Sequence, residues 1–413
     1  MSKQFLWLAV YHGFEGIRPC HYISNDLRPF ITQIVKWRYP LKKLLLASAI
    51  AMLSVSTVQA APTVYGKAFV TANYVNAELD RQSMDLPNDA INVNEDNSSV
   101  QVSSHSSRLG FKGSEAITAD TDVIYQLEYG IKIDDSGSDN IGFKSRDTYL
   151  GLKNKNFGQF RFGRNYSVSD YVNNVTVNEG YWDNIGSSSL GSSNTLTEAL
   201  TLTDGERINN SIVWIAPKYN DLPVELALQY GADESFVSDS SDRDSGFGAS
   251  LMFDPGTGFT AGVGYDKDMS VTGEILRGSA SVNLGKYVAY PVKLGALYQQ
   301  VDFDDSNDEE KGLVVSAEMG LTNLSRPASV YLQYDKTENL AGLGGNDSDQ
   351  IVLGGKYKFK DNMIAHAYIG KNSADLENGL LVVRDYDNNT AEEVVARGDA
   401  DVFAIGGGLE YKF

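Results

Sequence analysis

The sequence predicts an all-β chain that folds as a transmembrane β-barrel of sixteen antiparallel strands. Three observations support this prediction. Apolar and polar residues alternate at every second position in one short segment after another, which is the period of a half-buried strand. The composition, with 39 Gly, 23 Tyr and only 10 Pro, is typical of many strands joined by turns and flanked by aromatic belts. The chain also ends on a strongly alternating segment, 400–413, whose last residue is aromatic.

This C-terminal segment shows the alternation most clearly. One face carries large apolar side chains, and the other carries Ala404, Glu410 and Lys412 among glycines. A phenyl ring at the very end of a soluble domain would be exposed to water, whereas at the rim of a transmembrane barrel it belongs to the outward aromatic girdle. The apolar face consists of Phe403, Ile405, Leu409, Tyr411 and Phe413.

Charge and hydropathy exclude two other classes of protein. The chain of 413 residues has 35 basic and 54 acidic residues, which argues against nucleic acid as a partner. Outside one stretch near the N-terminus, no run approaches 18 consecutive apolar residues, so we expect no helix to span a bilayer.

The exceptional stretch near the N-terminus has the pattern of a secretory signal peptide. Two lysines precede a short apolar run, and small residues occupy the last and third-last positions before the end at Ala60. We therefore expect a signal peptide over 41–60, cleaved after Ala60, and the barrel over 61–413. Residues 1–40 are longer than the charged region of a bacterial signal. We interpret them as a non-native leader from a mis-called start, with an extended targeting region as the alternative.

Cleavage at this point would change the charge and the cysteine content of the chain. Residues 1–60 hold 7 basic and 2 acidic residues, so the mature chain would carry a formal charge of −24. It would also lose Cys20, the only cysteine, and would need no disulfide to fold in an oxidising compartment.

The predicted strands follow one another from Val64 to the end of the chain. The segment 122–134, for example, places Tyr125 and Leu127 on one face and Gln126 and Glu128 on the other. Each segment alone is a weak signal, but their even number suits an outer-membrane barrel. The predicted strands are 64–77, 99–113, 122–134, 143–155, 157–168, 207–218, 222–233, 244–254, 258–268, 274–285, 290–303, 311–322, 327–338, 348–359, 363–373 and 400–413.

The connectors between these segments alternate in length. Short turns fall at 114–121, 155–157, 219–221, 255–257, 286–289, 323–326 and 360–362. Longer, acidic connectors fall at 78–98, 135–142, 169–206, 234–243, 304–310, 339–347 and 374–399, and only 269–273 is brief. Short turns on one rim and long loops on the other are typical of outer-membrane barrels. A β-sandwich or a propeller would not give this alternation.

Several sequence blocks resemble the general diffusion porins of Gram-negative outer membranes. The resemblance covers essentially all of 62–413, and it implies a sixteen-stranded antiparallel barrel, usually trimeric, with its third long loop folded into the pore. The blocks are V-Y-G-K-A at 64–68, S-R-L-G-F-K-G at 107–113, R-D-T-Y-L-G-L at 146–152, F-G-Q-F-R-F-G-R at 157–164, R-I-N-N-S-I at 207–212 and L-E-Y-K-F at 409–413.

The resemblance also implies a charged constriction inside the pore. Four bases in the middle of predicted strands match the basic wall of the family, and opposing carboxylates are needed to hold such a cluster together. The connector 169–206 is the candidate constriction loop, and we expect its Glu179 and Asp183 to be the facing acids. A basic wall opposite an acidic loop sets up a transverse field that sorts polar solutes. The predicted wall bases are Lys67, Arg108, Arg146 and Arg207.

The loop departs from the family pattern at its tip. The enteric porins carry a Pro-Glu-Phe-Gly-Gly type of turn there, and this chain has instead a Gly/Ser-rich run at 186–193. The geometry of the tip and the width of the pore therefore do not follow from the resemblance. Arg164 has two interpretations, lining the lumen or pairing across a subunit interface.

Chemistry other than transport has little support in the sequence. His105 and His366 are the only histidines of the expected mature chain and lie far apart in sequence, which disfavours a catalytic pair and an enzyme such as an outer-membrane phospholipase. No phosphate loop, nucleophile elbow or zinc-ligand spacing is present, so we expect no cofactor and no metal.

The function expected from these observations is a passive outer-membrane channel for small hydrophilic solutes and ions that prefers cations. One alternative is a substrate-selective porin for oligosaccharides, with Tyr181 and Trp182 as a sugar track, and another is a surface adhesin or phage receptor. Expected partners are two further copies in a homotrimer, lipopolysaccharide and membrane lipid. The barrel assembly machinery is a further partner and would read Tyr411 and Phe413 as its signal.

Overall fold

The computed structural model describes residues 61–83, 92–134, 143–183, 196, 198–218, 222–232, 245–385 and 392–413. Residues Pro62–Phe413 form one compact unit. The predicted leader at 1–40, the signal peptide at 41–60 and the Gly/Ser-rich run at 186–193 lie outside the described residues. Within the described ranges, no helix has the length and apolar character needed to cross a membrane.

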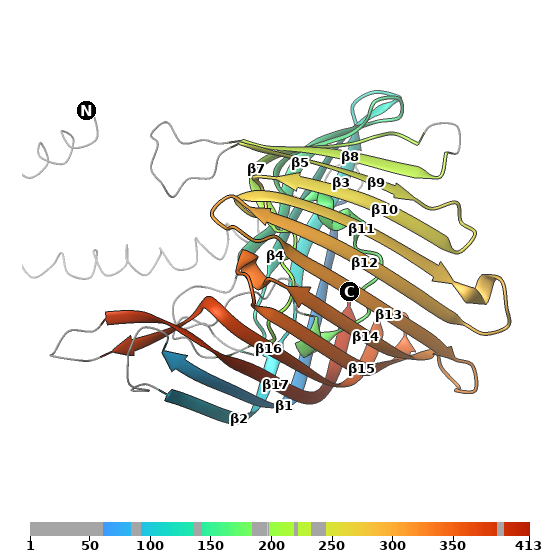
Figure 1. The fold of residues 1–413 in the computed structure, drawn as a ribbon. Helices are drawn as coiled ribbons and strands as arrows, with labels where there is room; N and C mark the ends of the chain where they lie inside the picture. The colour runs from blue at the N-terminus through green and yellow to red at the C-terminus, as the bar shows by residue number, and fades with distance from the viewer. Residues whose placement is uncertain are drawn as a thin grey trace, which may run out of the picture. The chain divides into compact units, whose positions relative to one another are not determined.

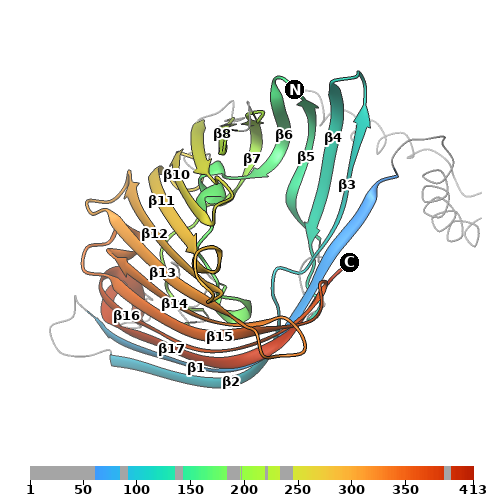
Figure 2. The same ribbon diagram turned by 90° about the vertical axis from the view of Figure 1, so that its right-hand side faces the viewer.

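A single antiparallel sheet closes on itself to form the barrel (Figures 1 and 2), as predicted. The first and last strands complete the ring, with Lys67 opposite Lys412 in the register that joins them. The strand segments are β1 (Thr63–Ser83), β2 (Asn92–Ser104), β3 (Arg108–Ala116), β4 (Thr121–Gly130), β5 (Lys144–Asn154), β6 (Gly158–Tyr166), β7 (Arg207–Ile215), β8 (Val224–Gly231), β9 (Gly246–Phe253), β10 (Phe259–Lys267), β11 (Gly273–Asn283), β12 (Val292–Phe303), β13 (Glu310–Leu321), β14 (Ala328–Glu338), β15 (Asp347–Lys360), β16 (Met363–Asp385) and β17 (Glu392–Lys412).

The segments β2 and β3 are two halves of one strand, so the barrel has the sixteen strands that were predicted. β1 pairs with β2 at one end and with β3 at the other. The predicted strand at 99–113 is interrupted at 105–107, where Ser106 has a positive φ of 43°. The Ser107 hydroxyl accepts a hydrogen bond from the Phe69 amide at 3.0 Å. It thus replaces the backbone acceptor that this amide lacks at the break in the strand.

Two predicted loops are in large part strand. β16 and β17 extend beyond the predicted 363–373 and 400–413 and pair through most of the predicted loop 374–399, with Val382 opposite Val395. β1 and β2 shorten the predicted loop 78–98 in the same way. Both hairpins lie side by side at the lower left of Figure 1. The apolar residues of these extensions are few or stand next to one another, as at 380–383, so no two-residue alternation marks the extensions in the sequence.

The outward face of the barrel is apolar. Along β17, the predicted outward residues Ile405, Leu409 and Tyr411 are all exposed, while Ala404 is fully buried on the other face. Exposure of this many large apolar side chains fits a surface that faces lipid. Further members of this belt are Leu150, Phe162, Leu228, Tyr230, Leu251, Val263, Leu276, Tyr298, Val315, Leu332, Leu353 and Ile369.

The described parts of the long connector between β6 and β7, 167–183 and 198–206, pack against the inner face of the barrel, and we call them together the inner segment (Figure 2). It contains the 3₁₀ turns η1 (Val168–Val172) and η2 (Gly180–Trp182). Wall side chains satisfy its backbone: Gln333 accepts from the Val177 amide at 2.8 Å, and Asn372 bonds both backbone groups of Leu200.

Apolar contacts hold the inner segment along the wall. Its buried residues Val177, Trp182 and Leu200 form one cluster with apolar residues of β1 and β14 to β17. Glycines on the wall make room for it, because a Cβ at Gly370 would lie 2.6 Å from Trp182 and one at Gly312 would lie 2.7 Å from Leu202. The segment therefore covers other parts of the inner face and leaves the inner face of β3 to β5 open to the lumen.

Candidate functional site

The four predicted wall bases lie together on one part of the inner wall. They come from four different strand segments: Lys67 from β1, Arg108 from β3, Arg146 from β5 and Arg207 from β7. Lys67 and Arg108 are direct partners in the register of β1 and β3. All four line one cavity of about 440 Å³, whose other charged lining residues are Asp183 and Asp204 of the inner segment.

Two carboxylates of the wall itself neutralise part of this basic cluster. Glu128 of β4 lies 2.8 Å from the Arg146 guanidinium and 3.7 Å from that of Arg108. Asp147 of β5 lies 3.2 Å from the Arg207 guanidinium. Neither acid was assigned a role from the sequence. Glu128 lies on the polar face of its predicted strand, which was the one sequence feature that could have indicated a position on the inner wall.

A β-bulge explains why the side chains of Arg146 and Asp147, although adjacent in sequence, both lie on the inner side of the barrel. Leu127 pairs with Thr148 and Tyr129 with Ser145, so Glu128 stands opposite two residues of β5. A bulge breaks the strict alternation of sides. The regular two-residue period of the sequence would have sent one of these two charges outward.

Asp183 is the acid of the inner segment that is open to the lumen. Its side chain is exposed, and no described residue forms an ion pair with it. Loss of hydration inside the barrel, and then the Glu179 carboxylate, raise the pKa of Asp183 to about 6, while Lys67 opposes this shift. Because lumenal water still reaches the carboxylate, we expect it to titrate at or somewhat below that value.

Glu179, the second predicted acid, lies in a different cavity. Its carboxylate pairs with the Lys356 ammonium at 2.9 Å, and it lines a cavity of about 410 Å³ together with His366, Glu410 and Lys412. The structure therefore places one of the two predicted acids opposite the wall bases and the other beside β15 to β17. Lys356 stood on the polar face of its predicted strand but had no predicted partner.

Arg277 of β11 fastens the two ends of the inner segment. Its guanidinium lies 3.2 Å from Asp170 near the start and 2.7 Å from Asp204 near the end, and only 1% of the side chain is exposed. Burial, and then the Asp204 carboxylate, raise the pKa of Asp170, and Arg277 opposes this rise. The role of Arg277 was not predicted, because nothing in the sequence of the strand at 274–285 indicates that Asp170, 107 positions earlier, is its partner.

The aromatic residues of the inner segment are not open to the lumen. Tyr181 is 8% exposed and Trp182 is fully buried, so neither ring is presented to a passing solute. The two histidines, far apart in sequence, lie against the same ring, with His105 and His366 at 5.7 and 4.8 Å from the centre of Phe69.

The remaining predicted residues lie on the strands themselves. Arg164 donates a hydrogen bond to Asn209 of β7. Phe413 closes the backbone ladder with Gly66 through two hydrogen bonds of 2.9 and 3.1 Å, and its half-exposed ring stacks on Tyr411 at 6.3 Å. The last residue therefore has a backbone role and a separate exposed ring.

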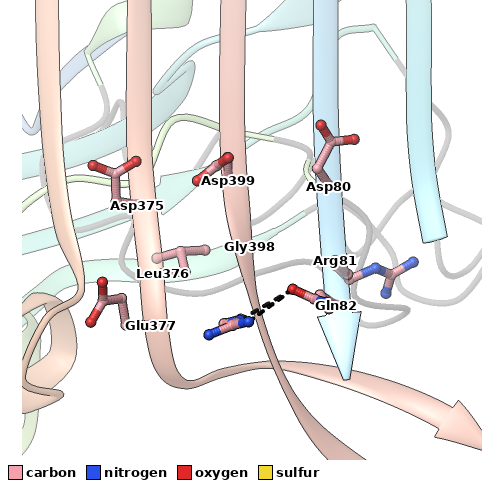
Figure 3. Close-up of a pocket in the computed structure, with 9 residues that line it drawn as sticks. Asp80, Arg81, Gln82, Asp375, Leu376, Glu377, Gly398 and Asp399 are labelled. Carbon is pink, nitrogen blue, oxygen red and sulfur yellow. Dashed lines mark hydrogen bonds between the residues drawn. The ribbon is translucent and has the colours of Figure 1, made fainter. Parts of the chain in front are cut away.

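A third cavity, of about 530 Å³, lies where β1, β16 and β17 continue beyond the apolar belt (Figure 3). Asp80, Asp399 and Asp375 are consecutive partners across these three strands. Nearby, the Arg397 guanidinium donates to the Gln82 side chain at 3.0 Å. Like charges in direct register destabilise a sheet, so this part of the hairpin depends on its backbone ladder.

Comparisons with known proteins agree with this geometry. Residues 46–376 match the Gram-negative porin family. Outer membrane porin N of Escherichia coli (strain K12) is 24% identical over 352 residues, which cover 75% of this chain and 89% of the relative. Outer membrane protein F of Serratia marcescens is 26% identical over 343 residues, which cover 74% of this chain and 84% of the relative.

Solved structures show the same fold. An anion-selective porin from Comamonas acidovorans superposes with a TM-score of 0.59 at 18% identity, covering 85% of this chain and 99% of that chain. Salmonella typhi OmpF in complex with daunomycin gives a TM-score of 0.53 at 19% identity, covering 85% of this chain and 97% of that chain.

Proposed function

The chain belongs to the Gram-negative porin family of outer-membrane channels, and from this premise we propose a passive, water-filled pore that prefers cations and admits small hydrophilic solutes. In this proposal the inner segment narrows the pore. Lys67, Arg108, Arg146 and Arg207 form the basic side of the constriction, and Asp183 and Glu179 are acids of the opposite side.

The observation that carries the proposal is the uneven pairing of charges around the larger lumenal cavity. Three of the four wall bases lie within 4 Å of Glu128 or Asp147, whereas Asp183 has no such partner among the described residues. A charge that is already paired contributes little field at a distance. The exposed, unpaired acid therefore contributes more to the lumenal field than the count of four bases would indicate.

The mouth of the pore supports the same sign. The stretch 302–310, which ends β12 and leads into β13, contains five exposed acidic residues, the buried Glu310 and no basic residue. Acidic groups at an entrance raise the local concentration of cations and lower that of anions. The fold alone does not decide the sign, because one structural neighbour is an anion-selective porin.

The alternative of an oligosaccharide-selective porin has less support. Its proposed sugar track consisted of Tyr181 and Trp182, and both rings are buried. A role as an adhesin or phage receptor is compatible with a pore and concerns the outer surface. The relatives are channels and not enzymes.

Partners and processing form part of the proposal. We propose a homotrimer embedded in outer-membrane lipid and lipopolysaccharide. Assembly would be guided by Tyr411 and Phe413 at the exposed end of β17. We also propose that residues 1–40 are a non-native leader and that the signal peptide at 41–60 is removed, so that the mature protein begins at Ala61.

Planar-bilayer recording of the purified protein tests the proposal. In a KCl gradient, we expect stepwise channel openings and a zero-current potential with the sign of a cation-selective pore. Uncharged sugars of increasing size should enter liposomes that carry the protein until a size limit is reached. An anion-selective sign, or the absence of channels, would contradict the proposal.

A further inference from the structure

The cavity around Glu179 contains a set of metal-ligand atoms that the channel proposal does not use. His366 of β16, Glu410 of β17 and Glu179 of the inner segment each offer one donor atom, and these three atoms lie within 4.8 Å of one another. The His366 Nε2 to Glu410 Oε2 distance is 3.0 Å. The cluster lies near the rim with short turns, three residues after the start of β16 and two residues before the end of β17.

We propose that Glu179, His366 and Glu410 form a binding site for a divalent transition-metal ion, with Zn²⁺ as the representative ion. Zn²⁺ binds imidazole nitrogen and carboxylate oxygen at about 2.0–2.2 Å, which places tetrahedral donor atoms about 3.3 Å apart. Two donors already have this spacing, and Glu179 approaches them by a small movement of its side chain. The remaining coordination position is filled by water from the cavity.

The packing of His366 favours this role. Its side chain is 1% exposed and its ring lies 4.8 Å from Phe69, which fixes its orientation. Its Nδ1 has no hydrogen-bond partner in the described structure. In the neutral ring the proton is therefore on Nε2, facing Glu410. When a metal binds Nε2, the ring carries its proton on Nδ1 without an acceptor among the described residues, which lowers the affinity.

When no metal is bound, two lysines form ion pairs with the carboxylates of the proposed site. Lys356 lies 2.9 Å from Glu179, and Lys412 lies 2.7 Å from Glu410. A metal ion must displace both ammonium groups, which lowers its affinity. Lys412 is 52% exposed and both side chains border the cavity, so they have room to turn away. The imidazole ligand favours Zn²⁺ over Mg²⁺, which prefers oxygen donors only.

Metal binding would join the inner segment to the barrel wall. Glu179 belongs to the segment, whereas His366 and Glu410 belong to neighbouring strands. The ion would also add two positive charges beside the lumen. We therefore expect Zn²⁺ to shift the channel away from cations, whatever selectivity the metal-free protein has.

Calorimetric titration of the folded, detergent-purified barrel with ZnCl₂ tests the site directly, without reference to channel function. We expect one Zn²⁺ per chain, and binding at least about tenfold weaker in His366→Gln and in Glu179→Gln, since loss of a ligand exceeds the effect of outer-shell changes. Glu179 lies outside the strands, so its variant tests the site even if His366→Gln folds poorly.

Matched controls separate the site from general effects. His105→Gln removes the other histidine beside Phe69, and Asp183→Asn removes an acid from the same inner segment, and both should bind Zn²⁺ like the parent. In bilayers, Zn²⁺ should shift the zero-current potential toward anions in the parent and in Asp183→Asn but not in Glu179→Gln. The proposal is overturned if the parent binds no Zn²⁺, if both site variants bind it as the parent does, or if Mg²⁺ reproduces the effect.

Discussion

In the proposed constriction we expect single charges to differ in their effect on ion selectivity, because their partners differ. Asp183 is exposed and unpaired among the described residues, whereas Glu179 is held by Lys356 and Arg108 shares Glu128 with Arg146. In water, a unit charge about 10 Å away changes the energies of a cation and of an anion by about 0.4 kcal/mol in opposite directions, so each permeability changes about twofold and their ratio about fourfold.

The variant Asp183→Asn should therefore reduce the ratio of cation to anion permeability by about fourfold at low salt. Adding Glu179→Gln should shift it further, because Lys356 would lose its partner. The measurement is the zero-current potential in a KCl gradient. Asp361→Asn, in the exposed turn between β15 and β16, is the charge-matched control and should behave like the parent. If the double variant keeps the parent potential, these acids do not face the ion path.

Replacing Arg108 and Arg146 together with Gln should have the opposite effect. It would leave Glu128 without its two partners, so a negative charge would be added to the lumenal field while two bulky side chains are shortened. We expect a stronger cation preference and a larger single-channel conductance. A shift toward anions would show that Glu128 is not exposed to the field of the pore.

The pH dependence of selectivity follows from Asp183. Its pKa is raised to about 6, so the carboxylate is charged above this value and becomes neutral as the pH falls through it. Cation preference should therefore decline between pH 7.5 and pH 5, measured as zero-current potential. In Asp183→Asn this decline should be much smaller, and an equal decline would assign the titration to other acids.

At the scale of the elements, the inner segment depends on Arg277. This buried guanidinium lies between Asp170 and Asp204, and its removal would leave two neighbouring carboxylates unopposed. Loss of one partner of a buried ion pair costs up to about 3–5 kcal/mol, and less here because both acids are partly exposed.

The variant Arg277→Gln should loosen both ends of the inner segment. We expect noisier open channels, more frequent closures and a lower thermal unfolding temperature of the folded barrel. Arg326→Gln, which removes an exposed arginine from a short turn, is the control. Quiet channels with parent-like stability would mean that the apolar contacts alone hold the segment.

The end of β17 combines two roles that a pair of variants can separate. Phe413 bonds Gly66 through its backbone, and its half-exposed ring packs over Gly66 and stacks on Tyr411. Deletion of Phe413 should lower the amount of folded, heat-modifiable barrel in the outer membrane. If the ring is the assembly signal, Phe413→Ala should have most of the same effect. A loss confined to the deletion would indicate that the backbone ladder is what matters.

At the scale of the whole molecule, we expect the proposed cation preference to have one contribution from the acidic mouth and one from the constriction. Raising the salt from about 0.1 M to about 1 M shortens the screening length from about 10 Å to about 3 Å. The cation preference should decline with salt, first through the mouth and then through the constriction. The part of the cation preference that Asp183→Asn removes should decline less steeply with salt than the part that remains in this variant. Selectivity independent of salt would argue against a charge-based mechanism.

The sequence by itself determined the architecture of this protein. Alternation along each strand and the lengths of the connectors are local properties, so they predicted a closed barrel of sixteen strands and the outward face of β17. The wall bases also followed from the sequence, because family-like blocks mark Lys67, Arg108, Arg146 and Arg207. The two hairpin extensions did not, because their apolar residues are few or adjacent, as at 380–383, and leave no two-residue period.

Only the tertiary structure decided which charges meet. Glu128 and Asp147 pair with the wall bases because a bulge in β5 and the registers of β3 to β7 bring them there. Glu179 meets Lys356, and Asp170 and Asp204 meet Arg277, because the inner segment packs against strands that are distant from it in sequence. The physical reason is that these contacts depend on the registers of many strand pairs summed around a closed ring, whereas a sequence pattern records only what each strand does by itself.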